Sequence, residues 1–345
     1  MSVEQRFTLA AIQANHVMFD RDGATDKACR LIGDAAAAGA TIAAFGEAWL
    51  HGYPFFADVT FQPLSWRAMA EYHANAVEVP SPTTKRLCAA AKKGGIDVVI
   101  GVVERDTDTF GTVYCTLLFI GKEGRILGRH RKLKGTHAER AIWGDGDASG
   151  LRVYQRPYGR ISGLNCWEHN IILPTYALAA QGTQIHVAAW PGREPDHPPD
   201  YPDIIWPRQL LLSRAFASQA ACYVICAAGI RLTSDVPERY QELAIYEHTG
   251  QSCIIDPRGE IIAGPADGET ILLAEGSMEA VLAAKSAVDA GGHYSRPDLL
   301  RLVVDRGVPT GLGFVDRRGA DRPSSGCLDA EILAPPEQQT PPAVA

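Results

Sequence analysis

One thiol in the sequence stands where it could act as a nucleophile. Cys166 lies in the run GRISGLNCWEHN, where an apolar strand is predicted to meet a new helix. Unpaired N–H groups at the start of a helix favour a thiolate over a thiol. A nucleophilic cysteine also needs a base for its proton and a donor for the charge that develops on the substrate. Two upstream residues, Glu47 and Lys132, are of the types that could supply these functions.

Glu47 ends the apolar run TIAAFGE and is followed by AWLHGYP. A carboxylate at the end of a buried strand is costly unless it has a partner or a function. In sheets covered by helices, functional groups gather at the carboxyl ends of the strands. Glu47 is therefore a candidate general base, and a solvated acid at a strand end is the alternative interpretation.

Lys132 lies in the basic stretch GRHRKLKGTHAER, which also contains Glu139 seven residues later. A lysine ammonium is a compact point charge and can stabilise an anion that forms during a reaction. The spacing does not distinguish Lys132 from Lys134, and an exposed basic patch is the alternative interpretation.

Composition argues against several other classes of protein. The 345 residues carry a net charge of −7 with scattered Lys and Arg, so neither nucleic acid nor an anionic membrane is an expected partner. No apolar run reaches the ~18 residues of a membrane span, and eight unevenly spaced cysteines do not form a disulfide framework. Asp145 and Asp147 mimic a calcium loop, but its twelfth position is Arg156. We expect a cytoplasmic enzyme or binding protein that holds neither a metal nor an organic cofactor.

Predicted strands and helices alternate along the chain. Strands are expected at 7–15, 41–47, 96–104, 112–120, 160–167, 183–190 and 222–230, with a hairpin over 251–264. Helices are expected before Gly39 and at 81–93, 174–181, 207–221 and 277–289. Strands this apolar are usually covered on both faces, which predicts a layered α/β fold. Residues 1–305 are interpreted as one domain, and the Gly- and Pro-rich residues 306–345 as a partly disordered tail or an assembly segment.

Together these segments resemble the nitrilase branch of the carbon–nitrogen hydrolase superfamily. FGEAWLHGYP is similar to the family's glutamate motif, HRKLKGTHAERAIWGDGD to its lysine motif and GLNCWEHN to its cysteine motif. QIHVAAWP and GHYSRPDLLRL are further family-like stretches, and all follow the family's order between residue 7 and about 305. The resemblance implies an αββα sandwich that dimerises to αββααββα and can extend into spirals or filaments.

The resemblance also assigns chemistry to four residues. It makes Glu47 the general base, Lys132 the charge-stabilising lysine, Cys166 the nucleophile and Glu139 the group that orients the lysine. The implied reaction converts a nitrile to its carboxylic acid and ammonia through a thioimidate and a thioester. An amidase or carbamoylase with the same triad is the first alternative, and a non-catalytic assembly protein that kept the fold is the second.

The substrate is expected to contact aromatic residues near these motifs: Trp49, Tyr53, Trp167, His169 and Trp190. Their aromatic character suits an aryl or arylalkyl nitrile, although aliphatic nitriles stay open. Gly46 and Gly135 replace residues with restricted φ in the family, and NIILPTYAL replaces its usual continuation after the cysteine motif. The two glycines predict loops that are looser or differently aimed, and the altered segment bears on substrate preference.

Overall fold

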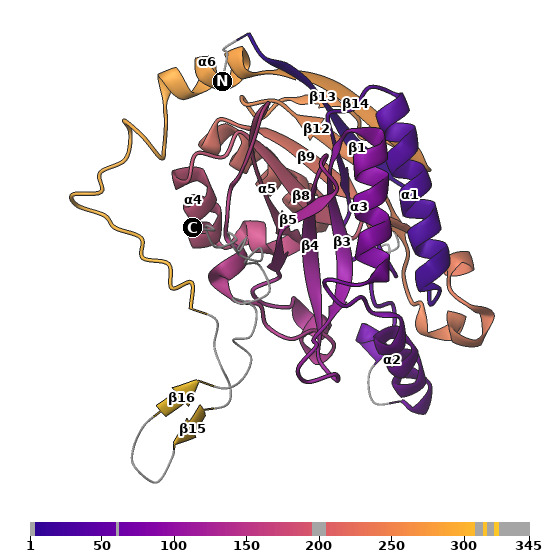
Figure 1. The fold of residues 1–345 in the computed structure, drawn as a ribbon. Helices are drawn as coiled ribbons and strands as arrows, with labels where there is room; N and C mark the ends of the chain where they lie inside the picture. The colour runs from indigo at the N-terminus through magenta and orange to yellow at the C-terminus, as the bar shows by residue number, and fades with distance from the viewer. Residues whose placement is uncertain (1–3, 60–61, 195–204, 308–312, 316–320, 324–345) are drawn as a thin grey trace, which may run out of the picture. The chain divides into compact units, whose positions relative to one another are not determined.

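Two six-stranded mixed β-sheets form the centre of the protein in a computed structural model (Figure 1). The structure describes residues 4–59, 62–194, 205–307, 313–315 and 321–323. The chain forms two compact units, residues 1–306 and 307–345, and both large sheets belong to the first. In the second unit, strands β15 (Gly313–Val315) and β16 (Asp321–Pro323) pair antiparallel. The predicted disorder of the tail concerns mainly residues outside the described part of the chain.

Each sheet has a parallel centre and antiparallel edges. The first has the order β14 (Thr270–Ser277), β1 (Arg6–Gln13), β2 (Ile42–Phe45), β3 (Asp97–Arg105), β4 (Val113–Gly121), β5 (Arg125–Arg131). The second has the order β13 (Ile261–Ala263), β12 (Cys253–Ile255), β9 (Tyr223–Ala228), β8 (Ile185–Trp190), β7 (Gly159–Asn165), β6 (Tyr154–Arg156). β1, β2 and β3 run parallel in the first sheet, as do β7, β8 and β9 in the second.

The two sheets pack face to face because alternate residues of a strand point to opposite faces. Leu9 and Ala11 of β1 share one buried apolar cluster with Ile185 and Val187 of β8. Every member of this set is shielded from solvent. The inner layer of the protein is therefore a dry interface between two sheets.

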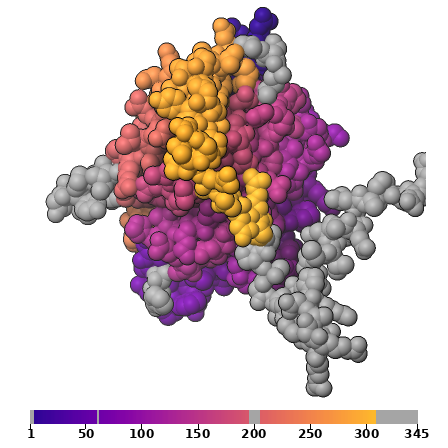
Figure 2. Space-filling view, turned by 90° about the vertical axis from the view of Figure 1, so that its left-hand side faces the viewer, coloured from indigo at the N-terminus to yellow at the C-terminus, as the bar shows by residue number. Residues whose placement is uncertain are grey.

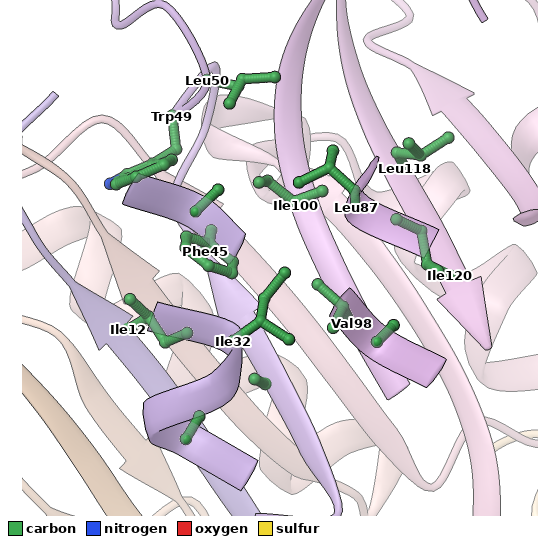
Figure 3. Close-up of a cluster of buried hydrophobic side chains, with 14 of the residues drawn as sticks. Ile12, Ile32, Phe45, Trp49, Leu50, Leu87, Val98, Ile100, Leu118 and Ile120 are labelled. Atoms are coloured by element: carbon green, nitrogen blue, oxygen red, sulfur yellow. The ribbon is translucent and has the colours of Figure 1, made fainter. Parts of the chain in front are cut away.

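Helices cover the outer face of the first sheet. Ile12 points away from the second sheet and packs under α1 (Arg21–Ala37) and α3 (Pro82–Gly94). Figure 3 shows this layer, with Ile32 of α1 and Leu87 of α3 among the strand residues that they cover. Burying side chains of this size contributes about 1.5–3 kcal/mol each, which makes the layer a main source of stability.

The outer face of the second sheet is covered in the same way. Ala188 of β8 and Val224 of β9 belong to a buried cluster with residues of α4 (Ile172–Ala180) and α5 (Ile205–Ala220). The order of layers is thus helix, sheet, sheet, helix. The predicted αββα sandwich is confirmed, together with the strand–helix alternation from which a layered fold was inferred.

Local signals place the ends of several helices. Ser81 caps α3 by accepting from the Thr84 N–H, and Gly95 ends the helix with a left-handed φ of 67°. Ser277 caps α6 (Met278–Ala287) by accepting from the Ala280 N–H.

Among the described residues, no helix is both long and apolar enough to cross a membrane. Leu300 and Val303, in the chain after α6, are about four-fifths exposed, and Figure 2 shows this part of the chain in front of the body of the molecule.

Several elements differ from the sequence predictions, and three of them show the reasons. α2 (Pro63–Asn75) was not predicted because only Ser65, Ala68 and Tyr72 on it are buried, which leaves no apolar stripe. β5 carries mostly basic residues and was taken for a possible surface patch. β14 is an edge strand with a half-exposed pattern, and only its pairing with β1 distinguishes it from a loop. The short elements are η1 (Ala57–Val59), η2 (His137–Ala141), η3 (Ala148–Gly150), η4 (Cys166–Asn170), η5 (Thr233–Asp235), η6 (Glu238–Leu243), β10 (Ile230–Arg231) and β11 (His248–Thr249).

Candidate active site

Three strand ends deliver the predicted catalytic residues. Cys166 directly follows β7, Lys132 directly follows β5, and Glu47 lies two residues beyond β2. β2 and β5 belong to the first sheet and β7 to the second, so the residues meet where the two sheets approach each other. Beyond each strand, the backbone no longer pairs regularly with a neighbouring strand. These side chains can therefore point toward a common site.

Lys132 joins two carboxylates in the interior of the protein. Its Nζ donates to Glu47 Oε1 at 2.7 Å and to Glu139 Oε2 at 2.6 Å. All three side chains are at most 2% exposed. The structure therefore selects Lys132 over Lys134, whose ammonium pairs with Asp145 on the surface.

Glu139 is held from several directions. Its Oε1 accepts from the Tyr53 hydroxyl at 2.7 Å, and its Oε2 accepts from the Thr136 N–H at 2.7 Å as well as from Lys132. Both oxygens are thereby committed, so Glu139 is suited to fixing the lysine. Tyr53 supports this carboxylate, and its predicted contact with the substrate stays a prediction.

Glu47 keeps one oxygen available. Its Oε1 accepts from Lys132 and from the Cys115 thiol, the latter at a sulfur–oxygen distance of 3.4 Å. Glu47 Oε2 is buried, and no described residue donates a hydrogen bond to it. A buried carboxylate oxygen without a donor can receive a proton. Cys115 gave no signal in the sequence, because it lies in an apolar strand.

Burial sets the charge state of this group. Burial raises the pKa of Glu47 and neighbouring Glu139 adds to the rise, while Lys132 opposes it, and the resulting pKa is about 7. Burial would lower the pKa of Lys132, but Glu139 and Glu47 raise it well above its usual range. At neutral pH the lysine is charged and Glu47 can both take and release a proton.

Cys166 lies against these carboxylates in a constrained conformation. Its Sγ and one carboxylate oxygen from each of Glu47 and Glu139 lie within 4.8 Å of one another. Its φ is 49°, in the left-handed region that a residue with a side chain rarely adopts. Such strain is retained at sites where the surrounding structure imposes it.

The tendency toward a thiolate that was expected of a helix start is outweighed at Cys166. Burial raises the pKa of the Cys166 thiol well above its usual range, and Glu47 raises it further. Lys132 and the Trp167 N–H act in the opposite direction but do not outweigh burial. The segment after Cys166 is a five-residue 3₁₀ turn, too short to supply a strong dipole. The thiol consequently depends on a base, and Glu47 is the neighbouring group with a free oxygen.

Glu168 connects the cysteine loop to the lysine loop. Its carboxylate accepts from the backbone N–H groups of Asn165 and Leu133 and contacts His130 Nε2 at 3.0 Å. Burial alone would raise the pKa of Glu168, but His130 and the two backbone donors bring it below its usual value. Glu168 lies within the cysteine motif, but the sequence did not indicate its function. Its hydrogen bonds fix the backbone beside Cys166 relative to the backbone beside Lys132.

Gly46 allows the chain before Glu47 to touch the second sheet. A Cβ at Gly46 would lie 2.7 Å from the Trp190 carbonyl oxygen and 2.8 Å from the Gly229 nitrogen. The Glu47 N–H donates to the same Trp190 carbonyl at 3.1 Å. The glycine therefore serves close packing rather than the looser loop that was predicted. A Cβ at Gly135 would meet Arg140 N at 3.1 Å, so that turn is also closely packed.

Gly46→Ala is expected to lower stability by about 1–3 kcal/mol and to displace Glu47, because the backbone atoms around the new Cβ cannot rotate away. Gly33→Ala is the matched control, since a Cβ there meets nothing within 4 Å on α1. Thermal unfolding should show a lower midpoint for the first variant and an unchanged or higher one for the second. Equal midpoints would contradict the packing argument.

Three of the predicted substrate contacts lie in the core instead. Trp49 is fully buried in the cluster between the first sheet and its helices, and its Nε1–H donates to the Ala14 carbonyl (Figure 3). Trp190 is fully buried, and its Nε1–H donates to Ser213 Oγ. His169 stacks on Trp190 with ring centroids 5.2 Å apart. A single chain position cannot tell whether an aromatic ring lines a cavity or fills the core, so substrate contact by these three residues stays a prediction.

Trp167 keeps its predicted place near open space. It is partly exposed and lines a cavity of about 290 Å³ together with residues of the lysine loop, among them Thr136 and Arg140. The cavity also includes Ile171, from the unusual segment after the cysteine motif. Substrate contact by Trp167 stays a prediction.

Among the described residues, Glu47, Glu139 and Cys166 form the one group with ligand atoms close enough to share a metal ion. Lys132 Nζ already lies within hydrogen-bonding distance of both carboxylates. The ammonium thus supplies the positive charge that such a cluster needs, and the arrangement fits acid–base and nucleophilic chemistry.

Comparison with known proteins identifies a matching family and several similar chains. Residues 8–285 match the carbon-nitrogen hydrolase family. The chain is 50% identical over 317 residues to Nitrilase 2 from an unknown prokaryotic organism, covering 91% of this chain and 98% of that protein. It is 36% identical to an aliphatic nitrilase of Rhodococcus rhodochrous, covering 97% and 94%. Nit3 of Saccharomyces cerevisiae, a member of branch 10 of the nitrilase superfamily, has a similar fold (TM-score 0.68, 20% identity, 84% and 96% covered).

Proposed function

Because this chain belongs to the carbon–nitrogen hydrolase family and to its nitrilase branch, we propose that it hydrolyses an organic nitrile to the carboxylic acid and ammonia. The observation that carries the proposal is the closeness of the buried Cys166 thiol to the carboxylate of Glu47, whose Oε2 accepts a hydrogen bond from no described residue. This pair supports a covalent mechanism in which the carboxylate activates the sulfur. Lys132 and Glu139 complete the proposed catalytic set.

The first half of the proposed reaction forms a thioimidate. Glu47 takes the thiol proton of Cys166 while the sulfur attacks the nitrile carbon, and the proton then passes to the nitrile nitrogen. Negative charge develops on that nitrogen in the transition state. The Lys132 ammonium and the Trp167 N–H, both of which act to lower the pKa of the Cys166 thiol, are available to stabilise it.

The second half consumes two water molecules. Glu47 takes a proton from the first water as it adds to the thioimidate carbon and passes this proton to the nitrogen. The proton of the new hydroxyl then reaches the nitrogen through Glu47 as the C–N bond breaks, so ammonia leaves and a thioester to Cys166 remains. The second water, activated by Glu47, cleaves the thioester and restores the thiol. The sum is R–C≡N + 2 H₂O → R–COOH + NH₃, and each proton taken by the carboxylate is returned. A carboxyl with a pKa near neutrality can act in both directions.

A panel of matched nitriles and amides tests the proposal. Aromatic, arylaceto- and aliphatic nitriles are supplied alongside their primary amides, and ammonia, acid and amide are all measured. We expect nitriles to give acid and ammonia at rates well above those of the amides. Rapid turnover of amides with inert nitriles would instead make the protein an amidase, and no turnover of either would favour a non-catalytic role.

The pH dependence follows from the pKa of about 7 of Glu47. Glu47 must be unprotonated to accept the thiol proton, so kcat/KM should rise with pH through about 7 and then level off. Cys166 and Lys132 have pKa values raised well above their usual range and contribute no change in this interval. Initial rates between about pH 5 and about pH 9 test this, and a limb in the ordinary carboxylate range would refute the assignment.

Self-association is a further part of the proposal. Ile172 and Leu173 of α4 and Leu211 of α5 are more than half exposed on two helices in contact with each other. Apolar surface of this kind marks interaction sites. We propose that residues 1–305 form the catalytic domain, that it assembles into dimers and larger spirals, and that the tail contributes to assembly. A mass of 37.2 kDa in solution, that of a single chain, would contradict assembly.

We also propose a cytoplasmic location. The seven cysteines within the described residues are all free thiols, which suits a reducing compartment. Fractionation of cells that express the protein tests the location, and recovery outside the cytoplasm would exclude it.

A further inference from the structure

A buried chain of hydrogen bonds leads from the interior of the second sheet to the backbone of Cys166. His169 Nδ1 contacts the Cys166 carbonyl oxygen at 2.7 Å, and His169 Nε2 contacts His186 Nε2 at 2.9 Å. His186 Nδ1 contacts Ser162 Oγ at 2.8 Å, and Ser162 Oγ contacts Thr183 Oγ1 at 2.7 Å. All members are buried. We call His169, His186, Ser162 and Thr183 the histidine relay.

The direction of every hydrogen bond in the relay follows from the acceptor at its end, the Cys166 carbonyl oxygen. A carbonyl oxygen can only accept, so His169 Nδ1 must carry a hydrogen. Burial lowers the pKa of His169 to about 4, so at neutral pH its Nε2 is bare and accepts from His186 Nε2–H. His186 Nδ1 then accepts from the Ser162 hydroxyl, and Ser162 accepts from Thr183. Each group donates toward Cys166, and neither ring is charged.

Aromatic packing holds the two rings in place. His169 lies against Trp190, and His186 lies against Phe216 with ring centroids 4.3 Å apart. The two imidazoles meet nearly perpendicular, at 80°. Because both rings are enclosed, they have no water with which to exchange hydrogen bonds, and a fully satisfied buried network specifies one arrangement.

The relay acts on the one peptide unit that reaches the reacting sulfur. The Cys166–Trp167 peptide is planar, so its C=O and N–H point in opposite directions. His169 holds the C=O, and the Trp167 N–H on the other side of the peptide acts to lower the pKa of the Cys166 thiol. The φ of Cys166 is positive, so the backbone at this residue is strained. It would relax to another conformation if its surroundings did not hold it.

We propose that His169, His186 and Ser162 are positioning residues that lock the Cys166–Trp167 peptide plane and so keep the Trp167 N–H aimed at the charge that develops on the substrate. The catalytic consequence rests on the nitrile hydrolysis proposed above. The relay itself is a property of the resting protein and can be measured without a substrate.

Solid-state nitrogen-15 NMR of the full-length, histidine-labelled protein tests the direction of the relay at neutral pH. We expect a bare Nε2 and a protonated Nδ1 on His169, and a bare Nδ1 and a protonated Nε2 on His186. Spectra of single His169 and His186 variants assign the signals. Protonation of His169 at Nε2 alone, or at both nitrogens, would overturn the relay whatever reaction the protein catalyses.

Two substitutions of His169 separate positioning from packing. His169→Asn keeps a side-chain N–H where Nδ1 was, whereas His169→Leu fills the space without a donor. We expect His169→Leu to lower kcat by ~100-fold with little change in KM, the cost of losing one aimed donor, and His169→Asn to recover most of it. Equal kcat values in the two folded variants would overturn the positioning role.

Further variants complete the design. Ser162→Ala removes the donor to His186 and should lower kcat by roughly tenfold, while Thr25→Val removes a buried hydroxyl on α1, far from the relay, and should leave kcat unchanged. A loss of kcat in both would mean that the effect reflects general stability and would overturn the relay. If the wild-type protein hydrolyses no nitrile, the proposed function fails, while the NMR result still decides the relay.

Discussion

Replacing Cys166 with alanine is expected to abolish nitrile hydrolysis, with kcat falling by at least about 10⁴-fold. The Cys166 sulfur is the atom that bonds to the substrate in the proposed mechanism. Its side chain contributes little to stability by comparison, because only one sulfur is removed from a buried position. Initial rates of ammonia release measure the effect.

Cys222→Ala is the matched control for this change. Cys222 is also a fully buried thiol, lies in the same apolar cluster, and has no part in the site. The control should keep its activity, and intact-mass measurement during turnover should find a substrate adduct in it but none in Cys166→Ala. Activity or adduct formation that survives in Cys166→Ala would remove the covalent mechanism.

Replacing Glu47 with glutamine is expected to lower kcat by about 10³-fold, the usual contribution of a general base. The amide has nearly the same shape and can still accept from Lys132, but it cannot receive the thiol proton. Because burial keeps the pKa of Cys166 well above its usual range, little thiolate forms without a base. The residual rate should no longer rise through pH of about 7.

Glu139→Gln tests whether charge alone explains that loss. Both substitutions remove one negative charge beside Lys132, but only Glu47 has an oxygen without a donor among the described residues. Glu139→Gln should lower kcat through the lysine and still keep the rise of kcat/KM near neutral pH. If Glu47→Gln keeps that rise and Glu139→Gln loses it, the base has been assigned to the wrong carboxylate.

Much of the architecture could be predicted because its signals are local. The cap at Ser81, the glycine that ends α3 and the DPRG turn between β12 and β13 each depend on residues within a few positions of one another. Continuous apolar strands likewise indicate that both faces are covered, which the helix–sheet–sheet–helix order confirms. α2 and β14 escaped prediction because their sequences carry weak patterns and their partners are distant in the chain.

The candidate site was likewise predicted in part from local signals, and in part it was decided by the tertiary structure. The sequence by itself determined the residue types Glu47, Lys132 and Cys166, since each lies in a motif at a strand end. Residue spacing left Lys132 and Lys134 open and the family resemblance favoured Lys132, while the tertiary structure shows that its ammonium reaches the carboxylates. A direction in space along an irregular loop depends on the contacts that the loop makes, and residue spacing does not encode it.

The charge state of the site also belongs to the tertiary structure. The start of a helix was expected to favour a thiolate at Cys166, but burial and the carboxylate of Glu47 favour the thiol. Trp49 and His169 have aromatic side chains suited to a substrate, yet one fills the core and the other supports the nucleophile from behind. A pKa and a side-chain role both depend on what surrounds the group after folding, because solvent exclusion and neighbouring charges arise from segments distant in the sequence.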